Sequence, residues 1–195
     1  MAKGATFERD ISKVLSQWWS VGLGGVKRDD IFWRSSQSGG RATQRAKFGK
    51  DTYGSYGDIT ALDPIGEPLM RFATIELKRG YKDTPWDLLE CKRTGAVRPF
   101  EKALVQAQKS SIQSGSLGWI LIGKRDRRRP VIYVERKLHR LYANEWPSST
   151  FSNWCIFHLE VNRIDLLRPA KFHFVAIDFE EWLAVVRPNQ IIECL

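Results

Sequence analysis

Two carboxylates and one ammonium group stand out, because their spacing could bring them onto one face of a sheet. Glu76 and Lys78 are two residues apart in an apolar, β-branched stretch, so in a strand they share one face. Asp58 begins a second stretch of this kind, and residues 63–66 contain the Pro and Gly of a chain reversal. We therefore expect a β-hairpin over residues 57–80 that brings Asp58 beside the other arm.

Such a cluster favours a divalent cation. Two carboxylates held among apolar neighbours are costly without a counter-ion. Carboxylate oxygens suit Mg²⁺, which usually keeps several waters and shares its shell with substrate phosphate. An adjacent lysine could position a water molecule and neutralise charge in the transition state. The alternative is an exposed hairpin that carries ordinary surface charges.

Asp58 followed by Glu76-Leu77-Lys78 resembles the D…(D/E)-x-K motif of the PD-(D/E)XK nuclease superfamily. The resemblance implies an α/β fold of the restriction-endonuclease type, with an αβββαβ core and a mixed central sheet flanked by helices. We expect residues 1–195 to form a single domain, with this core over about residues 4–123 and a C-terminal extension over about residues 124–195.

The resemblance also implies a Mg²⁺-dependent DNA endonuclease, with Mn²⁺ able to substitute. Asp58, Glu76 and the backbone carbonyl of Leu77 would bind the metal, and Lys78 would position the attacking water. Many members of the superfamily present a Gln or Lys from the helix after the E-x-K strand. Gln106 is our first choice for that position; an exposed helix residue without a role is the alternative.

Two further segments resemble the archaeal and phage Holliday-junction resolvase branch. Gly4…Phe7-Glu8-Arg9 is similar to the helix start of that branch, where the glutamate faces the metal site; Glu8 is therefore a candidate catalytic residue and metal ligand. The turn with Ser36 and Ser38 is similar to a segment that lies near the scissile phosphate. This branch implies a homodimer that acts on four-way junctions, in the cytoplasm of a prokaryotic or phage-infected cell.

The charge of the chain favours a polyanionic partner. A formal net charge of +9 and an isoelectric point near 9.6 fit DNA binding, although a basic protein without such a partner is the alternative. The basic residues that we expect to contact DNA lie in the loop before Asp58, after the E-x-K strand and in a later turn: Arg41, Arg45, Lys47, Lys50, Arg79, Arg127, Arg128 and Arg129.

Periodicity predicts the elements that would position these residues. Phe7, Ile11 and Leu15 share one stripe of a helix that runs to about residue 20, and Leu104, Ala107 and Ile112 are candidates for the buried face of a helix that begins near Pro99. Strands are expected at residues 30–35, 117–123, 130–134 and 172–177, and a helix capped by Asp178 at residues 178–186.

Other features of the sequence exclude some classes of site and leave some functions open. The second E-x-K triplet, Glu90-Cys91-Lys92, has helical surroundings, which favour a solvated helix face. Three dispersed cysteines predict neither a disulfide framework nor a zinc site. The longest apolar run, residues 117–122, is too short to span a membrane. Two alternatives to a resolvase stay open: a restriction-type or phage recombination or repair nuclease that acts on linear duplex, and a non-catalytic nucleic-acid-binding module.

Overall fold

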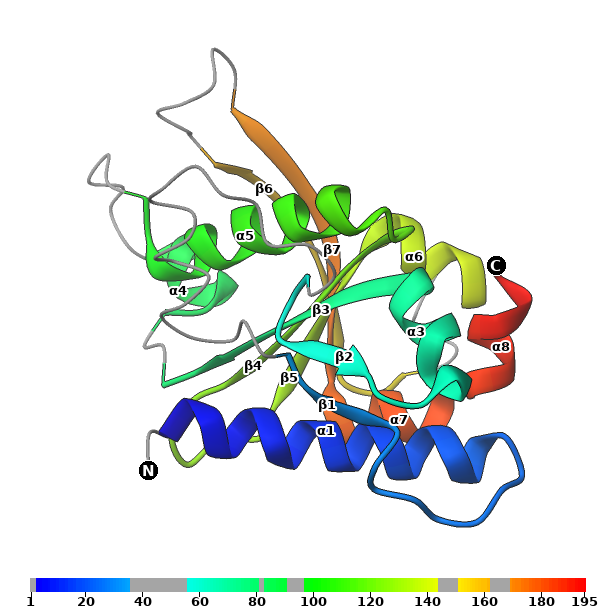
Figure 1. The fold of residues 1–195 in the computed structure, drawn as a ribbon. Helices are drawn as coiled ribbons and strands as arrows, with labels where there is room; N and C mark the ends of the chain where they lie inside the picture. The colour runs from blue at the N-terminus through cyan, green and yellow to red at the C-terminus, as the bar shows by residue number, and fades with distance from the viewer. Residues whose placement is uncertain (1–2, 36–55, 81–82, 91–96, 144–150, 162–168) are drawn as a thin grey trace, which may run out of the picture.

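The computed structural model describes residues 3–35, 56–80, 83–90, 97–143, 151–161 and 169–195. A mixed sheet forms the centre, with one long helix on each of its two faces (Figure 1). This arrangement confirms the predicted α/β class with a central sheet flanked by helices. Apart from additional short helical segments at residues 64–72 and 85–90, the predicted αβββαβ order is also observed within the first two thirds of the chain.

The main sheet has five strands in the order β3-β4-β5-β7-β6. Only the β3–β4 pair is parallel among these described strands, and the other pairs are antiparallel. β1 and β2 form a separate antiparallel pair. The strands are β1 Phe32–Arg34, β2 Ile59–Ala61, β3 Ala73–Arg79, β4 Gly118–Lys124, β5 Val131–Glu135, β6 Trp154–Val161 and β7 Ala170–Asp178.

The helices connect and cover these strands. α5 crosses over between the parallel strands β3 and β4, as a parallel connection requires. The helices are α1 Lys3–Gly22, α3 Glu67–Phe72, α4 Pro85–Glu90, α5 Pro99–Ser114, α6 Arg136–Tyr142, α7 Phe179–Val185 and α8 Pro188–Glu193, with a 3-10 turn, η1, at Pro64–Gly66. None of the helices in the described ranges combines the length and apolarity needed to cross a membrane.

The C-terminal third of the chain continues the sheet. β5, β7 and β6 extend it beyond β4, and α7 begins where Asp178 accepts hydrogen bonds from the backbone N–H groups of Glu180 and Glu181. The predicted strand at residues 172–177 and the predicted cap at Asp178 are therefore confirmed. The extension supplies three of the five strands of the main sheet, and the predicted core supplies the other two.

α1 holds β1 through packing and through one hydroxyl. The predicted stripe is buried, with Phe7, Ile11 and Leu15 each at most 4% exposed. On the same helix, the hydroxyl of Ser16 accepts a 2.8 Å hydrogen bond from the backbone N–H of Phe32, at the start of β1. This bond satisfies a buried polar group and fixes the height of β1 along α1.

The sheet separates two apolar clusters. On β4, Ile120 and Ile122 face the cluster that contains α1, whereas Trp119 and Leu121 face the cluster that contains α5. The alternation explains why this run is apolar throughout, since a strand covered on both faces has no solvated side. On β3, in contrast, only the α1 side is apolar.

The predicted hairpin is wrong in its connection. Residues 64–72 form η1 and α3 instead of a tight turn, and β2 pairs with β1 while β3 pairs with β4. Asp63 caps η1 by accepting a hydrogen bond from the backbone N–H of Ile65, and prolines occupy the first turns of both η1 and α3. These Asp-Pro and Glu-Pro pairs are helix-start signals, and they favour helical segments over the predicted hairpin turn.

α5 matches its prediction except at one position. The helix begins at Pro99 and ends at Ser114, and it is capped by Gly115, whose φ of 73° is left-handed and suits glycine. Leu104 and Ala107 are buried as predicted, but Ile112 is 76% exposed. Ile112 lies five residues after Ala107 and so falls off the buried stripe, where Ser111 takes the inward position instead.

Candidate active site

β3 presents the side chains of Glu76 and Lys78 on the face that α5 covers. Glu76 and Lys78 alternate with Ile75 and Leu77, which pack into the α1 cluster. The ammonium of Lys78 donates a 3.3 Å hydrogen bond to Oε2 of Glu76. Only 1% of the Glu76 side chain and 15% of the Lys78 side chain are exposed. A carboxylate this deeply buried needs several polar partners.

Asp58 reaches the same place from the start of β2. Its backbone N–H donates to the carbonyl of Ile75, and its Oδ2 accepts a 2.7 Å hydrogen bond from the N–H of Leu77. The Nζ of Lys78 lies 3.8 Å from Oδ2. The structure thus brings Asp58, Glu76 and Lys78 together, although the hairpin expected to do so is absent.

Gly57 makes this approach possible. Its φ of +77° is left-handed, and an added Cβ would lie 2.6 Å from the carbonyl oxygen of Ile75 and 2.8 Å from Cγ2 of Thr74. Any side chain here would push the Asp58 backbone away from β3. Close packing against β3 is therefore the reason that a glycine directly precedes Asp58.

The two carboxylates outnumber the positive charge between them. Burial and, to a smaller extent, the negative charge of Glu76 raise the pKa of Asp58 to about 7, although Lys78 and the N–H of Leu77 act in the opposite direction. One lysine cannot offset two buried carboxylates. A cation at this position would relieve the imbalance.

α5 supplies two polar contacts to Glu76. The side-chain amide of Gln106 donates to Oε2 at 2.9 Å, and the hydroxyl of Ser110 donates to Oε1 at 2.9 Å. The two residues are four apart and so lie on one face of the helix. Both oxygens of Glu76 are therefore fixed in place.

The structure places Glu8 beside the end of β1. Its Oε2 lies 3.1 Å from Nε of Arg34, and 16% of its side chain is exposed. Arg34 pairs with Ile59 in the β1–β2 ladder, next to Asp58. Glu8 is thus linked to the neighbourhood of the carboxylates through an arginine.

The donor set fits a hard divalent cation. In the described part of the chain, no three Asp, Glu, His or Cys side chains are grouped so as to hold a metal ion. Asp58 and Glu76 nevertheless supply buried carboxylate oxygens with excess negative charge, which suits Mg²⁺ binding through few protein ligands and several waters. Glu8 is not part of a three-carboxylate group in these residues.

The predicted DNA contacts fall into two sets. Arg79 ends β3, and Arg127, Arg128 and Arg129 lie exposed in the turn between β4 and β5. Arg129 faces Asp178 and Glu180 at 3.7 and 3.8 Å. The other candidates, Ser36, Ser38, Arg41, Arg45, Lys47 and Lys50, lie outside the described residues.

Two contact residues were not predicted. Ser110 was missed, although its position four residues after Gln106 was a usable signal. Ser35 was also missed: its hydroxyl donates to the carbonyl of Gly57 and its N–H donates to the carbonyl of Asp58, both at 2.8 Å. Ser35 follows β1, so only the β1–β2 pairing reveals its place.

The described part of the second E-x-K triplet is helical. Glu90 ends helix α4, and Cys91 and Lys92 lie outside the described residues. A helix turns by about 100° per residue, so it does not align residues two apart on one face as a strand does.

Comparison with known proteins agrees with the motif formed by Asp58, Glu76 and Lys78. A family model described as "Phage putative PDDEXK endonuclease" matches residues 1–193. Neither the curated proteins nor the solved structures gave a match. Since the model spans almost the whole chain, the protein belongs to the phage PD-(D/E)XK endonuclease family.

Proposed function

We propose that this protein is a Mg²⁺-dependent DNA endonuclease whose active site contains Asp58, Glu76 and Lys78. The observation that carries the proposal is the position of Lys78, whose Nζ lies 3.3 Å from Glu76 and 3.8 Å from Asp58 on the polar face of β3. Membership of the family supports the reaction class. The net charge of +9 supports a nucleic-acid substrate.

Asp58, Glu76 and the backbone carbonyl of Leu77 would hold the metal. A bound Mg²⁺ would supply charge neutralisation for the phosphodiester and its transition state. The N–H of Leu77 fixes Oδ2 of Asp58, and α5 fixes both oxygens of Glu76. These bonds orient the carboxylates before substrate arrives, which lowers the cost of reaching the reactive geometry.

Lys78 would hold and orient the attacking water through its ammonium. The water attacks phosphorus in line with the leaving oxygen, so positioning and charge neutralisation contribute most of the rate. Gln106 and Ser110 act through Glu76 as positioning residues. Glu8 acts less directly on the site, through its ion pair with Arg34 beside β2.

We further propose selectivity for branched DNA and action as a homodimer. The sequence around Glu8 and the turn with Ser36 and Ser38 support this finer assignment by resemblance to the resolvase branch. Two symmetric nicks in a junction call for two copies of the site, which a twofold dimer provides.

The test is a cleavage assay on a four-way junction and on a linear duplex of matched sequence. Wild type is compared with Lys78→Ala, with Mg²⁺ and with chelator, and Mn²⁺ is tested as a substitute. Lys137→Ala is the matched control, because Lys137 is an exposed lysine on α6 that pairs with Glu135. α6 lies at the end of the sheet away from Lys78.

Paired nicks in the junction alone, lost with chelator and in Lys78→Ala but not in Lys137→Ala, would support the full proposal. Equal cutting of both substrates would keep the active site and remove the branch selectivity. Tight binding to both substrates with no cleavage under any metal would contradict the enzymatic proposal and favour a binding module.

A further inference from the structure

A large cavity opens next to Lys78, on the α5 side of the sheet. Its volume is about 550 Å³, which falls within the range of small-molecule sites. Lys78 belongs to its wall, so the cavity starts where the candidate active site ends. The ends of β4 and β5, with α4 and the first turns of α5, form the remaining walls.

The inner wall of the cavity is aromatic and contains one unused polar group. Phe100 and Tyr133 pack edge to face with ring centroids 5.0 Å apart, above Leu121. Tyr133 is only 3% exposed, and its hydroxyl forms no hydrogen bond with any described residue. The hydroxyl lies in the cavity wall and is therefore available to donate or accept a hydrogen bond with a molecule inside the cavity.

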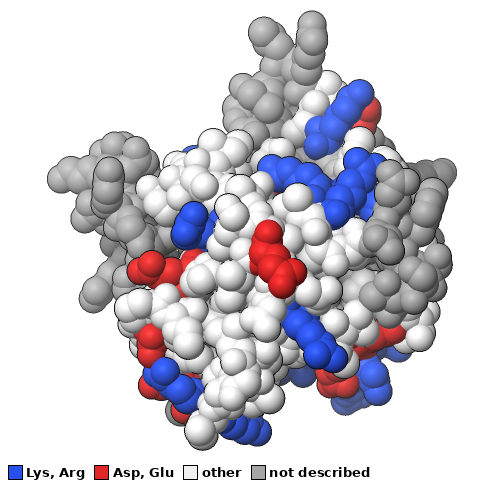
Figure 2. Space-filling view, turned by 90° about the vertical axis from the view of Figure 1, so that its right-hand side faces the viewer, with Lys and Arg blue, Asp and Glu red and all other residues white. Residues whose placement is uncertain are grey.

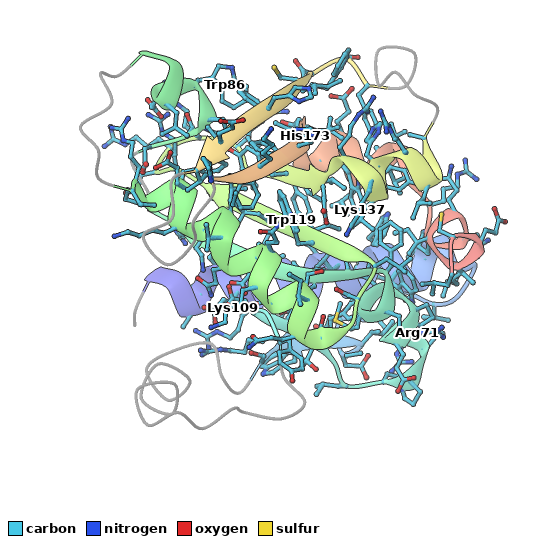
Figure 3. All side chains as sticks on the ribbon, turned by 90° about the horizontal axis from the view of Figure 1, so that it is seen from above. Arg71, Trp86, Lys109, Trp119, Lys137 and His173 are labelled. Atoms are coloured by element: carbon cyan, nitrogen blue, oxygen red, sulfur yellow. The ribbon has the colours of Figure 1, made fainter. Side chains whose placement is uncertain are left out.

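Trp86 forms the outer edge of the cavity. The side chain is 43% exposed, and its ring meets that of Phe157 at 4.9 Å and a near-perpendicular angle. Figure 3 shows Trp86, on α4, on the opposite side of the molecule from Arg71. An exposed indole held edge-on by a second ring is a suitable surface for stacking a planar group.

The rim of the cavity is positively charged. Five basic and two acidic side chains line it, an excess of three positive charges. Of the two acids, Asp87 accepts hydrogen bonds from Thr84 and faces Arg125 at 3.5 Å. Lys124 and Arg128 form no ion pair with any described residue. By contrast, Figure 2 shows charges of both signs dispersed over the face that carries α3, α6 and α8.

We propose that this cavity binds one unpaired nucleotide of the DNA substrate. The base lies inside, against Trp86 and the hydroxyl of Tyr133, and the flanking phosphates lie on Lys124 and Arg128. An aromatic interior with a cationic rim matches the two halves of a nucleotide. The inference rests on the proposed function, because the shared Lys78 would place this nucleotide beside the scissile phosphate.

Binding is tested with a fluorescent duplex that contains one unpaired 2-aminopurine and with the same duplex fully paired. Chelator is present so that no cleavage occurs, and affinity and 2-aminopurine quenching are both measured. We expect wild type to bind the unpaired form about fivefold to a hundredfold more tightly, with quenching, because stacking of one base contributes on that scale.

Two variants should reduce the preference, Trp86→Ala more strongly than Tyr133→Phe. Trp86→Ala loses the stacking surface, and Tyr133→Phe loses only the hydroxyl while keeping the ring that packs on Phe100. Tyr142→Phe is the matched control, since it removes a buried hydroxyl at the other end of the molecule, where it meets Trp182. We expect the control to keep the full preference.

Equal affinity of wild type for both duplexes would overturn the proposal, as would an equal loss of preference in Tyr142→Phe. In another outcome, the protein quenches the fluorescence of free 2-aminopurine deoxynucleotide, in a way that depends on Trp86 and Tyr133, and shows no preference between the duplexes. That result would assign the cavity to a free nucleotide and would also overturn the proposal. Cleavage with Mg²⁺ is measured separately, so a protein that keeps the preference but never cleaves would contradict only the proposed function.

Discussion

The carboxylate pair at β3 and the buried His139 on α6 lie at opposite ends of the sheet, and burial affects both. Burial raises the pKa of Asp58 to about 7 and lowers the pKa of His139 to about 4. In each place the uncharged form is favoured. Yet the two surroundings have little else in common.

His139 is isolated among rings. It packs against Tyr142 and Phe151, and its Nδ1 lies 3.3 Å from the guanidinium of Arg136. Its Nε2 has no hydrogen-bond partner among the described residues. At β3, by contrast, several charged and polar groups converge on one point. A shifted pKa therefore indicates a candidate site only where other polar groups meet it.

The largest expected effect is on the cleavage rate, which should depend on Glu76 but not on His139. Glu76→Gln should lower cleavage by about a thousandfold or more, because an amide cannot supply the negative oxygen that a metal needs. His139→Gln should leave the rate per folded molecule unchanged. Single-turnover cleavage rates with saturating Mg²⁺ test this contrast. Wild-type rates in Glu76→Gln would show that the carboxylate is only structural.

A second effect sharpens the comparison within the site. Gln106→Ala should reduce cleavage by roughly tenfold to a hundredfold, since it releases one oxygen of Glu76 while the carboxylate remains. The matched control is Gln108→Ala, two positions along α5 and therefore on another face. Titration of the rate with Mg²⁺ should show a weaker metal dependence for Gln106→Ala. An equal decrease in both variants would point to a general effect on α5.

The pH dependence of stability should report on His139. Its folded pKa of about 4 lies below the ordinary histidine value of 6.5, so the unfolded chain binds the proton more readily between these values. This contribution to stability is complete above pH 6.5 and is lost as pH falls through 4, with a magnitude of about 2–3 kcal/mol. Urea unfolding from pH 7 to 4 should show a shallower decline for His139→Gln than for wild type. His173→Gln, at an exposed position on β7, should follow wild type.

The contribution of Asp58 to stability should change with pH in the opposite direction. Its folded pKa of about 7 lies above the ordinary aspartate value of 3.8, so its contribution to stability is present below pH 3.8 and is lost as pH rises through 7. In chelator at pH 8, Asp58→Asn should be more stable than wild type by about 1–2 kcal/mol. Added Mg²⁺ should stabilise wild type and not the variant, by the linkage of binding to folding. A variant less stable than wild type at pH 8 in chelator would contradict the charge imbalance.

The smallest effect concerns the turn between β4 and β5. Replacing Arg127 and Arg128 with Gln should weaken binding severalfold for any DNA sequence and reduce the slope of log affinity against log salt by about 1–2. The same pair of changes at Arg136 and Arg140, on α6, is the control. An unchanged slope would mean that the turn is only solvated.

Much of the candidate site could be predicted from local pattern. Residues two apart in an apolar strand must share a face, and this alone places Glu76 and Lys78 together. Helical periodicity from Pro99 to Gly115 places Gln106 on α5, and the apolar run at residues 117–123 predicts the buried strand beside β3. Each of these inferences depends only on geometry within one element.

The tertiary structure decided how the elements meet. Asp58 reaches β3 from a strand paired with β1, because helix-start signals at residues 63–68 replaced the expected turn. Ser35 and the cavity beside Lys78 depend on packing between segments far apart in the chain. Sequence spacing determines which side chains share a face, whereas the partner opposite that face depends on long-range packing that no local pattern encodes.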